Sequence, residues 1–419
     1  MTSEIKQKIE QIRNGEVPKG YKRTRAGIMP CDWCTQNEYK AKDVFYSVSN
    51  KNHNGGYEVL SATQDRGVIP RSQVDIDIKY DDTNTGSYKM VDKGDFVISL
   101  RSFQGGIEYS EYTGLVSPAY TVLKPRVSIC NEYYKSYFKT NDFISRLNKG
   151  TYGIRDGKQV GLKDFGEMTI HFPPLPEQQR IAKILSAQDK VIECYEKKIE
   201  QLKRMKKYYL QNMFPKDGEE YPEIRFKGFT DPWEQRKLGE ISDSYSGGTP
   251  TAGKTEYYGG NIPFIRSAEV NSDYTELFLT EEGLKNSSAK MVNQGDILYA
   301  LYGATSGEVG IARINGAINQ AILDIKPHEN YDAQFIMQWL RKSKENIIST
   351  YLQGGQGNLS GTIVNSLMVF CPTYSEQKKI GKYLFTLDHL ITLHQRKCEE
   401  EKKKKKALQQ LLLTGIIRV

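Results

Sequence analysis

The sequence predicts an α+β protein in which a mixed α/β domain is repeated in tandem and each copy is followed by a long helix. Three observations predict this fold class: an internal repeat, short alternating strands rich in glycine and tyrosine, and two proline-free segments with a heptad pattern. We expect the two helices to pack as an antiparallel coiled coil, because a bare helix of about 37 residues would be unstable in water. The alternative is that each helix folds onto its own domain.

The second half of the chain repeats the first at a shift of about 200 residues. The clearest matches are KMVDKGD at 89–95 with KMVNQGD at 290–296, and EQQRIAKIL at 177–185 with EQKKIGKYL at 376–384. A further match pairs Pro30-Cys31-Asp32-Trp33 with Asp231-Pro232-Trp233. Because several ordered matches occur at a nearly constant shift, the chain is a tandem duplication.

The first part of each copy is about 140 residues long and contains short alternating runs, such as 95–99 and 296–299, separated by glycine-rich turns. A helix is expected over 332–344. Together these features predict a mixed α/β domain.

The second part of each copy is expected to be a long helix that begins after prolines, at Pro173-Pro174-Leu175-Pro176 in the first copy and at Cys371-Pro372 in the second. Pro176 and Glu177 suit the first turn of the first helix, and Ser375 can cap the second. Alternating spacings of three and four residues predict an apolar seam for the helix pair. Its members are Leu185, Ile192, Tyr195, Ile199, Leu202, Leu384, Leu387, Ile391, Leu408 and Leu412, with a polar stretch (His394, Cys398, Glu401, Lys405) in the middle of the second helix.

These patterns divide the chain into six parts. They are an N-terminal helical segment and linker at 1–29, the first domain at 30–174, a central helix at 175–214, a linker at 215–232, the second domain at 233–372 and a C-terminal helix at 373–419.

Composition favours a soluble globular protein with a polyanionic partner: hydrophobic residues make up 38% and the net charge is +8. The basic excess lies at 177–213 and 376–413, which contribute +4 and +5, so the rest of the chain is close to neutral at about −1. No run approaches the roughly 18 apolar residues of a membrane span, and the charged N-terminus is unlike a secretory signal. Six unevenly spaced cysteines suggest reduced thiols, so we expect a cytoplasmic protein.

Several of these segments resemble the specificity subunits of type I restriction–modification systems. The residues that carry the resemblance are PLPEQQRI at 174–181, its weaker copy after Pro372, WEQRKLGE at 233–240, GGTP at 247–250 and YYGGNIP at 257–263. The chain departs from the family pattern at Cys31-Asp32-Trp33-Cys34, and at Thr373-Tyr374-Ser375, where Leu-Pro is expected.

The resemblance implies that each α/β domain is a target-recognition domain that reads one half of a split DNA site. It also implies that the paired helices set the spacer and dock two modification subunits, that motor and nuclease subunits join this core, and that the chain itself is non-catalytic. S-adenosylmethionine, ATP and Mg are then expected in the partner subunits, with no cofactor in this chain. Three alternatives are the specificity chain of another multisubunit restriction or methylation system, a self-contained enzyme, and a coiled-coil scaffold without a DNA role.

Two short motifs suggest other chemistry. GTPTAGKT at 248–255 matches the letters of a phosphate-binding loop, but polar residues precede it and poor helix formers follow it, so a surface turn is expected. Cys31 and Cys34 have the spacing of a redox or zinc motif, but a zinc site needs a second pair of ligands. A methyltransferase motif and a nuclease carboxylate cluster are both missing from the sequence, so we expect no catalytic or metal site.

Candidate DNA-binding residues are those in glycine-rich or polar loops whose side chains can form bidentate or stacking contacts with bases. In the first domain they are Arg66, Arg71, Arg101, Gln104, Tyr152, Arg155 and Lys158, and in the second Lys254, Arg266, Tyr302, Thr305, Gln356 and Asn358.

Overall fold

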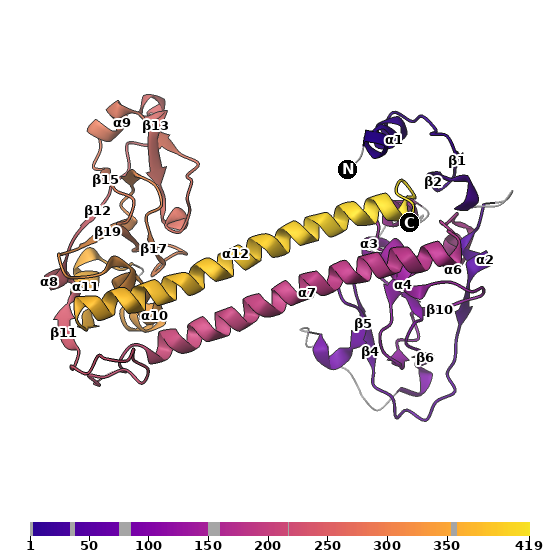
Figure 1. Ribbon diagram of the computed structural model, residues 1–419, viewed down its shortest axis with the longest axis horizontal. Helices are drawn as coiled ribbons and strands as arrows, with labels where there is room; N and C mark the ends of the chain where they lie inside the picture. The colour runs from indigo at the N-terminus through magenta and orange to yellow at the C-terminus, as the bar shows by residue number, and fades with distance from the viewer. Residues whose placement is uncertain (1–2, 34–37, 75–84, 150–159, 217, 353–357) are drawn as a thin grey trace. The chain divides into compact units, whose positions relative to one another are not determined.

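The computed structural model describes residues 3–33, 38–74, 85–149, 160–216, 218–352 and 358–419. The chain divides into two compact units, one formed by Met1–Cys194 with Cys398–Val419 and the other by Tyr195–Lys397. Each unit contains one α/β domain and a part of both long helices (Figure 1). Within the described ranges, no helix combines the length and the apolar character that crossing a membrane requires.

The first unit begins with a helix and a two-stranded hairpin, followed by the first α/β domain. Its helices are α1 (Ser3–Arg13), α2 (Ala41–Val44), α3 (Ser102–Gly105), α4 (Asn131–Tyr137), α5 (Asn141–Lys149) and α6 (Leu162–Glu167), with 3-10 turns η1 (Cys31–Trp33), η2 (Arg71–Gln73) and η3 (Thr85–Ser87). Its strands are β1 (Tyr21–Thr24), β2 (Gly27–Pro30), β3 (Phe45–Val48), β4 (Leu60–Thr63), β5 (Gly67–Pro70), β6 (Lys89–Val91), β7 (Phe96–Ile98), β8 (Glu108–Tyr109), β9 (Gly114–Val116) and β10 (Thr121–Pro125).

The second unit contains the second α/β domain. Its helices are α8 (Leu238–Ile241), α9 (Glu281–Lys285), α10 (Ala333–Tyr351) and α11 (Gly361–Asn365), with 3-10 turns η4 (Thr255–Tyr257) and η5 (Ser267–Glu269). Its strands are β11 (Glu234–Lys237), β12 (Ser242–Ser246), β13 (Tyr258–Ile265), β14 (Phe278–Leu279), β15 (Lys290–Val292), β16 (Ile297–Ala300), β17 (Val309–Ile311), β18 (Gly316–Ile318), β19 (Ile322–Pro327) and β20 (Met368–Cys371). The helix expected over 332–344 is thus confirmed as α10, with the Asp332 carboxylate accepting from the Phe335 amide at its N-cap.

The two domains share one sheet plan, which confirms the mixed α/β prediction. The main sheet has the order β3-β10-β7-β8 in the first domain and β12-β19-β16-β17 in the second. A second pairing, β6 with β9 and β15 with β18, is antiparallel in both. The duplication that is visible in the sequence is therefore also a duplication of strand order.

The repeated KMVxxGD segment forms the same turn in both domains. Gly94 and Gly295 have φ angles of 101° and 104°, a region that L side chains rarely adopt. The carboxylate of Asp95 accepts from the Asp92 amide at 2.8 Å, and that of Asp296 accepts from the Asn293 amide at 2.8 Å. The glycine and the aspartate thus account for this motif, because together they form the turn between two strands.

The long helices are α7 (Leu175–Asn212) and α12 (Tyr374–Leu413). The glutamine of the repeated Glu-Gln pair anchors each start: Gln178 donates to the Pro173 carbonyl and accepts from the Cys130 amide, and Gln377 contacts Pro372 and Asp332 in the same way. The predicted Ser375 cap is wrong. Helix α12 already includes Tyr374, and the Thr373 carbonyl accepts the amides of residues 376 and 377, so Ser375 lies inside the first turn.

The helices run antiparallel within each unit. In the first unit, Ile181 and Leu185 of α7 share a core with Leu412, while Gln188 hydrogen bonds to Glu401 and Asp189 pairs with Lys405. In the second unit, Tyr195 lies against His394 with ring centroids 5.8 Å apart, and Lys206 Nζ lies 2.5 Å from Asp388. In both units, therefore, residues further along α7 contact residues earlier in α12.

The predicted seam residues are the less exposed positions of both helices. Leu185, Ile192, Leu202, Leu384, Leu387, Ile391 and Leu412 are buried, and Tyr195, Ile199 and Leu408 are half-buried. The polar stretch follows the same period, since Cys398 is buried and His394, Glu401 and Lys405 are half-buried. The seam therefore continues through the polar stretch, where hydrogen bonds and ion pairs join the helices.

Each domain core includes the start of its own helix and the end of the other copy's helix. The first core contains Ile181 and Leu185 of α7 together with Leu412 and Leu413 of α12. The second contains Ile380 and Leu384 of α12 and the α7 residue Leu202, and it extends to Met213 and Phe214 just after α7. Packing of each helix onto its own domain, which the sequence left as the alternative, thus occurs together with contacts between the helices within each unit.

Ion pairs also link the start of each long helix to a residue that follows the other long helix. Glu177 accepts from Trp33 Nε1 at 2.9 Å and from Arg418 Nε at 2.6 Å, and Arg418 also contacts Asp32. In the second unit Glu376 accepts from Nε and Nη2 of Arg225, both at 2.8 Å. The first glutamate of the repeated motif therefore binds an arginine that follows the other copy's helix.

Candidate nucleic-acid interface

In the first domain the structure brings two predicted loops together. Arg66 lies in the exposed turn between β4 and β5. Arg101 and Gln104 are exposed on the segment between β7 and β8, where Gln104 belongs to the short helix α3. Gln64 of the first loop donates to Gln104 of the second at 3.1 Å. Lys139 Nζ donates to the carbonyls of Gln64 and Gly105 at 3.1 and 2.8 Å, which fixes the two loops to each other.

The charges of Arg71 and Arg101 both act on Tyr120, which is half-buried. Burial raises the pKa of the Tyr120 hydroxyl, and the charges of Arg71 and Arg101 partly offset this shift.

A buried ion pair lies behind these loops. Both carboxylate oxygens of Glu108 on β8 lie 2.6 Å from Lys139 Nζ. Burial raises the pKa of Glu108 to about 7, although the charge of Lys139 acts in the opposite direction. Sequence reasoning missed Gln64, Glu108 and Lys139. Gln64 could have been found from its place two residues before Arg66, whereas nothing local marks the other two.

Four predicted residues, Tyr152, Arg155, Lys158 and Gln356, lie outside the described residues. Their role stays a prediction from the sequence.

In the second domain Tyr302 and Thr305 lie in the loop between β16 and β17, which corresponds to the β7–β8 loop of the first domain. An isolated antiparallel bridge pairs Tyr302 with Asn358, so residues predicted from two distant segments are neighbours. Asn358 is exposed and Tyr302 is half-buried, with its pKa raised by burial. The corresponding loops of both domains therefore present predicted candidates.

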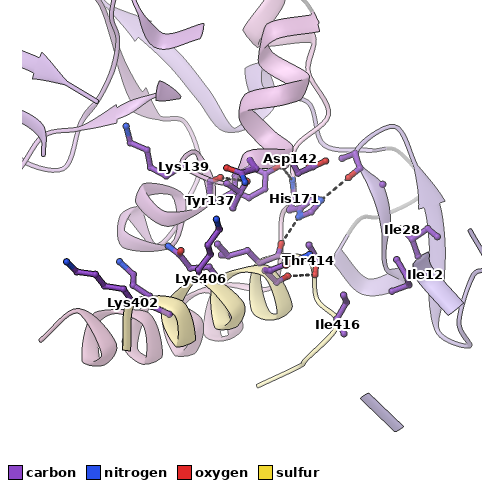
Figure 2. A pocket seen from close by; sticks show the side chains of 18 of the residues that line it. Ile12, Ile28, Tyr137, Lys139, Asp142, His171, Lys402, Lys406, Thr414 and Ile416 are labelled. Carbon is purple, nitrogen blue, oxygen red and sulfur yellow. Dashed lines mark hydrogen bonds between the residues drawn. The ribbon is translucent and has the colours of Figure 1, made fainter. Parts of the chain in front are cut away.

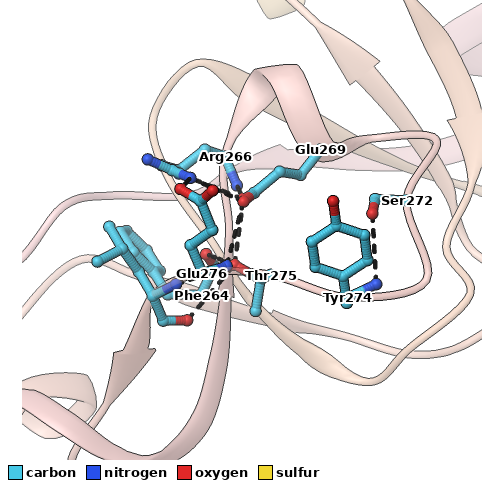
Figure 3. Close-up of polar contacts among 8 residues, drawn as sticks. Phe264, Arg266, Glu269, Ser272, Tyr274, Thr275 and Glu276 are labelled. Carbon is cyan, nitrogen blue, oxygen red and sulfur yellow. Dashed lines mark hydrogen bonds and ion pairs between the residues drawn. The ribbon is translucent and has the colours of Figure 1, made fainter. Parts of the chain in front are cut away.

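Arg266 lies at the end of β13, where its guanidinium faces two carboxylates (Figure 3). Nη2 lies 2.8 Å from Glu269 and 2.7 Å from Glu276. The hydrogen bonds that Arg266 donates to both carboxylates raise its pKa above the ordinary value for arginine. The sequence pattern did not single out either glutamate.

Lys254 is exposed, and its Nζ donates to the Tyr257 hydroxyl at 3.0 Å. The segment after it forms the short 3-10 turn η4 and then β13, whereas a phosphate-binding loop would lead into an α-helix. This geometry agrees with the surface turn that the sequence predicts.

Cys31 is exposed, while Cys34 lies outside the described residues. The neighbouring Asp32 accepts from Arg418, and the interaction lowers its pKa. Throughout the described ranges, no group of three or more His, Cys, Asp and Glu side chains is arranged to hold a metal ion.

The first unit also contains a cavity of about 740 Å³ beside the end of α12 (Figure 2). His171 lies at its wall, with Nδ1 2.7 Å from the Leu413 carbonyl and Nε2 3.2 Å from the Ala26 carbonyl. Lys402 and Lys406 line the cavity from α12. One side of the charged run 402–406 therefore borders this cavity.

Comparison with known proteins gives consistent matches. The sequence matches the family described as type I restriction modification DNA specificity domain over residues 37–204 and 230–402, which is most of the chain. The putative type I restriction enzyme MjaX specificity subunit of Methanocaldococcus jannaschii is 28% identical and aligns over 96% of this chain and 97% of its own length. The EcoR124I/EcoR124II specificity subunit of Escherichia coli is 23% identical over 61% of this chain and 63% of its own length.

The fold is also similar to that of a solved structure. The crystal structure of a type I restriction–modification system S subunit from M. genitalium superposes with a TM-score of 0.60, covering 90% of this chain and 95% of that one. Sequence identity in this superposition is 15%, so the likeness concerns the fold.

Proposed function

Since the chain belongs to the type I restriction–modification DNA specificity family, we propose that each of its two α/β domains reads one half of a bipartite DNA target. The observation that carries this proposal is the duplication. Each matched segment contains the main sheet of one domain, with the same strand order in both. A tandem pair of similar domains with different loops suits a target with two different halves.

The candidate loops have the chemistry that base recognition requires. The first domain presents Arg66, Arg101 and Gln104 from loops joined by hydrogen bonds, and the second presents Tyr302 and Asn358 from a bridged pair. Arginine and glutamine can form bidentate contacts with base edges in the major groove. The near-neutral charge of the domains suits a protein whose partners supply part of the phosphate affinity.

The paired helices are proposed to set the distance between the half-sites. A helix pair held by seam contacts in both units is stiffer than a flexible linker, whose end-to-end distance fluctuates. Inserting seven residues into each helix preserves the heptad seam and adds about 10 Å. The unspecified gap in the target should then grow by about three base pairs, and an unchanged gap would refute this role.

As a specificity subunit the chain is non-catalytic, so the chemistry is assigned to its partners. We propose that two modification subunits bind the helices, one for each copy of the repeat, and bring S-adenosylmethionine. Motor and nuclease subunits that use ATP and Mg would join this core, in the cytoplasm where the DNA is.

The experiment that tests the proposal is co-expression with the matching modification subunit in a host without other DNA methylation, followed by single-molecule methylome sequencing. A new methylated motif with two defined halves and a fixed gap is the expected result. A complex that forms and methylates DNA without such a motif would refute sequence reading, and failure to form a complex would refute the role of the helices.

A further inference from the structure

The loop that follows β13 in the second domain holds an arginine between two carboxylates of very different exposure (Figure 3). Arg266 Nη2 lies 2.8 Å from Glu269 Oε1 and 2.7 Å from Glu276 Oε2, and Arg266 Nε lies 3.3 Å from Glu269 Oε2. The side chain of Glu269 is 12% exposed and that of Glu276 is 72% exposed. One carboxylate is thus built into the domain, and the other lies at the surface.

Glu269 is held in place by the loop backbone. Its carboxylate lies 2.9 Å from the amide nitrogen of Arg266, 3.3 Å from that of Glu276 and 3.1 Å from the Thr275 hydroxyl. The Thr275 hydroxyl is itself buried and lies 2.8 Å from the Phe264 carbonyl. Burial acts to raise the pKa of Glu269, but these hydrogen bonds outweigh it and the pKa lies below its usual value. Glu269 therefore stays ionised and orients the guanidinium.

Glu276 is the exchangeable partner. An ion pair this exposed contributes little to stability, because water solvates both charges. Releasing Glu276 frees one N–H of Arg266 Nη2, while the hydrogen bonds from Nε and Nη2 to Glu269 still fix the guanidinium plane. The cluster can therefore open toward a ligand without disturbing the fold.

The charge of this cluster argues for a base edge and against a phosphate. One arginine and two glutamates sum to a net negative charge, so a phosphate at this point would meet two carboxylates. A base edge carries no net charge. In the major groove a G·C pair displays two acceptors on guanine and an amino donor on cytosine, which match an arginine and a carboxylate.

The position of the loop places it with the other candidates. Turn η5 packs against β16, the strand that leads into the loop of Tyr302 and Thr305. Arg266 is therefore on an element adjacent to the proposed reading loop.

We propose that Arg266 and Glu276 together read one G·C pair in the half-site of the second domain, and that Glu269 positions Arg266. In the bound state Arg266 donates to the guanine acceptors and Glu276 accepts from the cytosine amino group. This inference rests on the proposed function and adds to it the base pair that these residues recognise.

The test uses the complex with its modification subunit and synthetic duplexes that vary each position of both half-sites. R266M should lower the preference for a G·C pair by about 10- to 100-fold at one position of the second half-site, with the first half-site unchanged. E276A should relax the same position by a smaller factor, because the arginine contact remains. E269Q should also relax that position, which a purely structural role of Glu269 would not single out.

R236M is the matched control, since Arg236 forms an exposed ion pair with Glu234 in the same domain. It should leave both half-sites unchanged. Unaltered base preference in R266M, or a uniform loss of methylation at all positions, would overturn the inference. If R266M fails to assemble, R266K decides in its place, because lysine keeps the charge and loses the bidentate fork. A wild-type complex without a bipartite motif would instead overturn the proposed function.

Discussion

The two α/β domains share a sheet plan but differ in the charged residues that the plan buries. In the main sheets, Val97 of β7 stands opposite Glu108 in the first domain, whereas the equivalent Leu298 of β16 stands opposite Gly310. On the other side, Val97 pairs with Val122 and Leu298 with Asp324. Each sheet therefore buries one acidic residue, on different strands. The strand order of the main sheet is the same in both domains, whereas the position of the buried acidic residue is not. The reason is that a change in strand order would rearrange the whole core.

The helix starts show the same contrast. Gln178 and Gln377 make equivalent contacts, whereas Glu177 shares Arg418 with Asp32 and also binds Trp33, and Glu376 has Arg225. The glutamine contacts are to backbone atoms, which any sequence supplies. The glutamate contacts are to side chains, and while both glutamates bind an arginine, the contacts with Trp33 and Asp32 are particular to the first copy.

The largest loss of stability is expected on substitution of Glu376. The side chains of Glu376 and Arg225 are 0% and 14% exposed, so E376A leaves a charge buried without its partner and should destabilise the second unit by about 3 kcal/mol. E177A should cost about 1–2 kcal/mol, because Arg418 is more exposed and keeps Asp32. Urea unfolding with hydrogen exchange for each unit measures both. E200A, which breaks an exposed pair with Arg204, is the control. Equal costs for the three variants would contradict the comparison.

The next largest loss of stability is expected at the glutamine of each helix start, and it should be equal in the two copies. Q178A and Q377A each remove two hydrogen bonds to buried backbone, so each should cost about 2 kcal/mol in its own unit. The exposed neighbour Gln179 provides the control, Q179A, with little expected change. The same unfolding measurements apply, and a large difference between the two variants would show that the helix starts are not equivalent.

A pH dependence should distinguish the two buried acids. Burial raises the pKa of Glu108 to about 7 and that of Asp324 to about 6, whereas unfolded chains ionise these groups near 4. Between these values the native state binds more protons, so stability falls as the pH rises, from about 4.5 to 7 in the first unit and from about 4 to 6 in the second.

E108Q should flatten the first dependence and D324N the second, measured as unfolding free energy against pH in each unit. D243N, at an exposed carboxyl, serves as the control. If the unfolding free energy still falls over the same pH ranges in both variants, groups other than Glu108 and Asp324 cause the pH dependence.

The smallest effect is expected at Lys254, which is exposed and directly precedes the short turn η4. As a phosphate contact it should add affinity without sequence information. K254A should lower the salt dependence of DNA binding by a slope of about 1 and leave the methylated motif unchanged. A changed base preference would instead assign Lys254 to base reading, as proposed for Arg266.

Much of the fold could be predicted because its signals are local. The repeat, the glycine turns at Gly94 and Gly295, helix α10 and the two long helices depend on periodicity and turn preferences within a few residues. The seam positions also followed from spacing, including the half-buried Glu401 and Lys405. The candidate residues on separate segments could be named from the sequence. The hydrogen bond between Gln64 and Gln104 that joins those segments could not be predicted.

By itself, then, the sequence determined the duplication, the family resemblance and the positions of the elements. Only the tertiary structure decided which distant residues became partners: Arg418 with Glu177, Arg225 with Glu376, and Arg266 with Glu269 and Glu276. The physical reason is that a helix or turn depends on neighbours along the chain. An ion-pair partner depends on which segments the core brings together, and any of the many charged residues could serve until packing selects one.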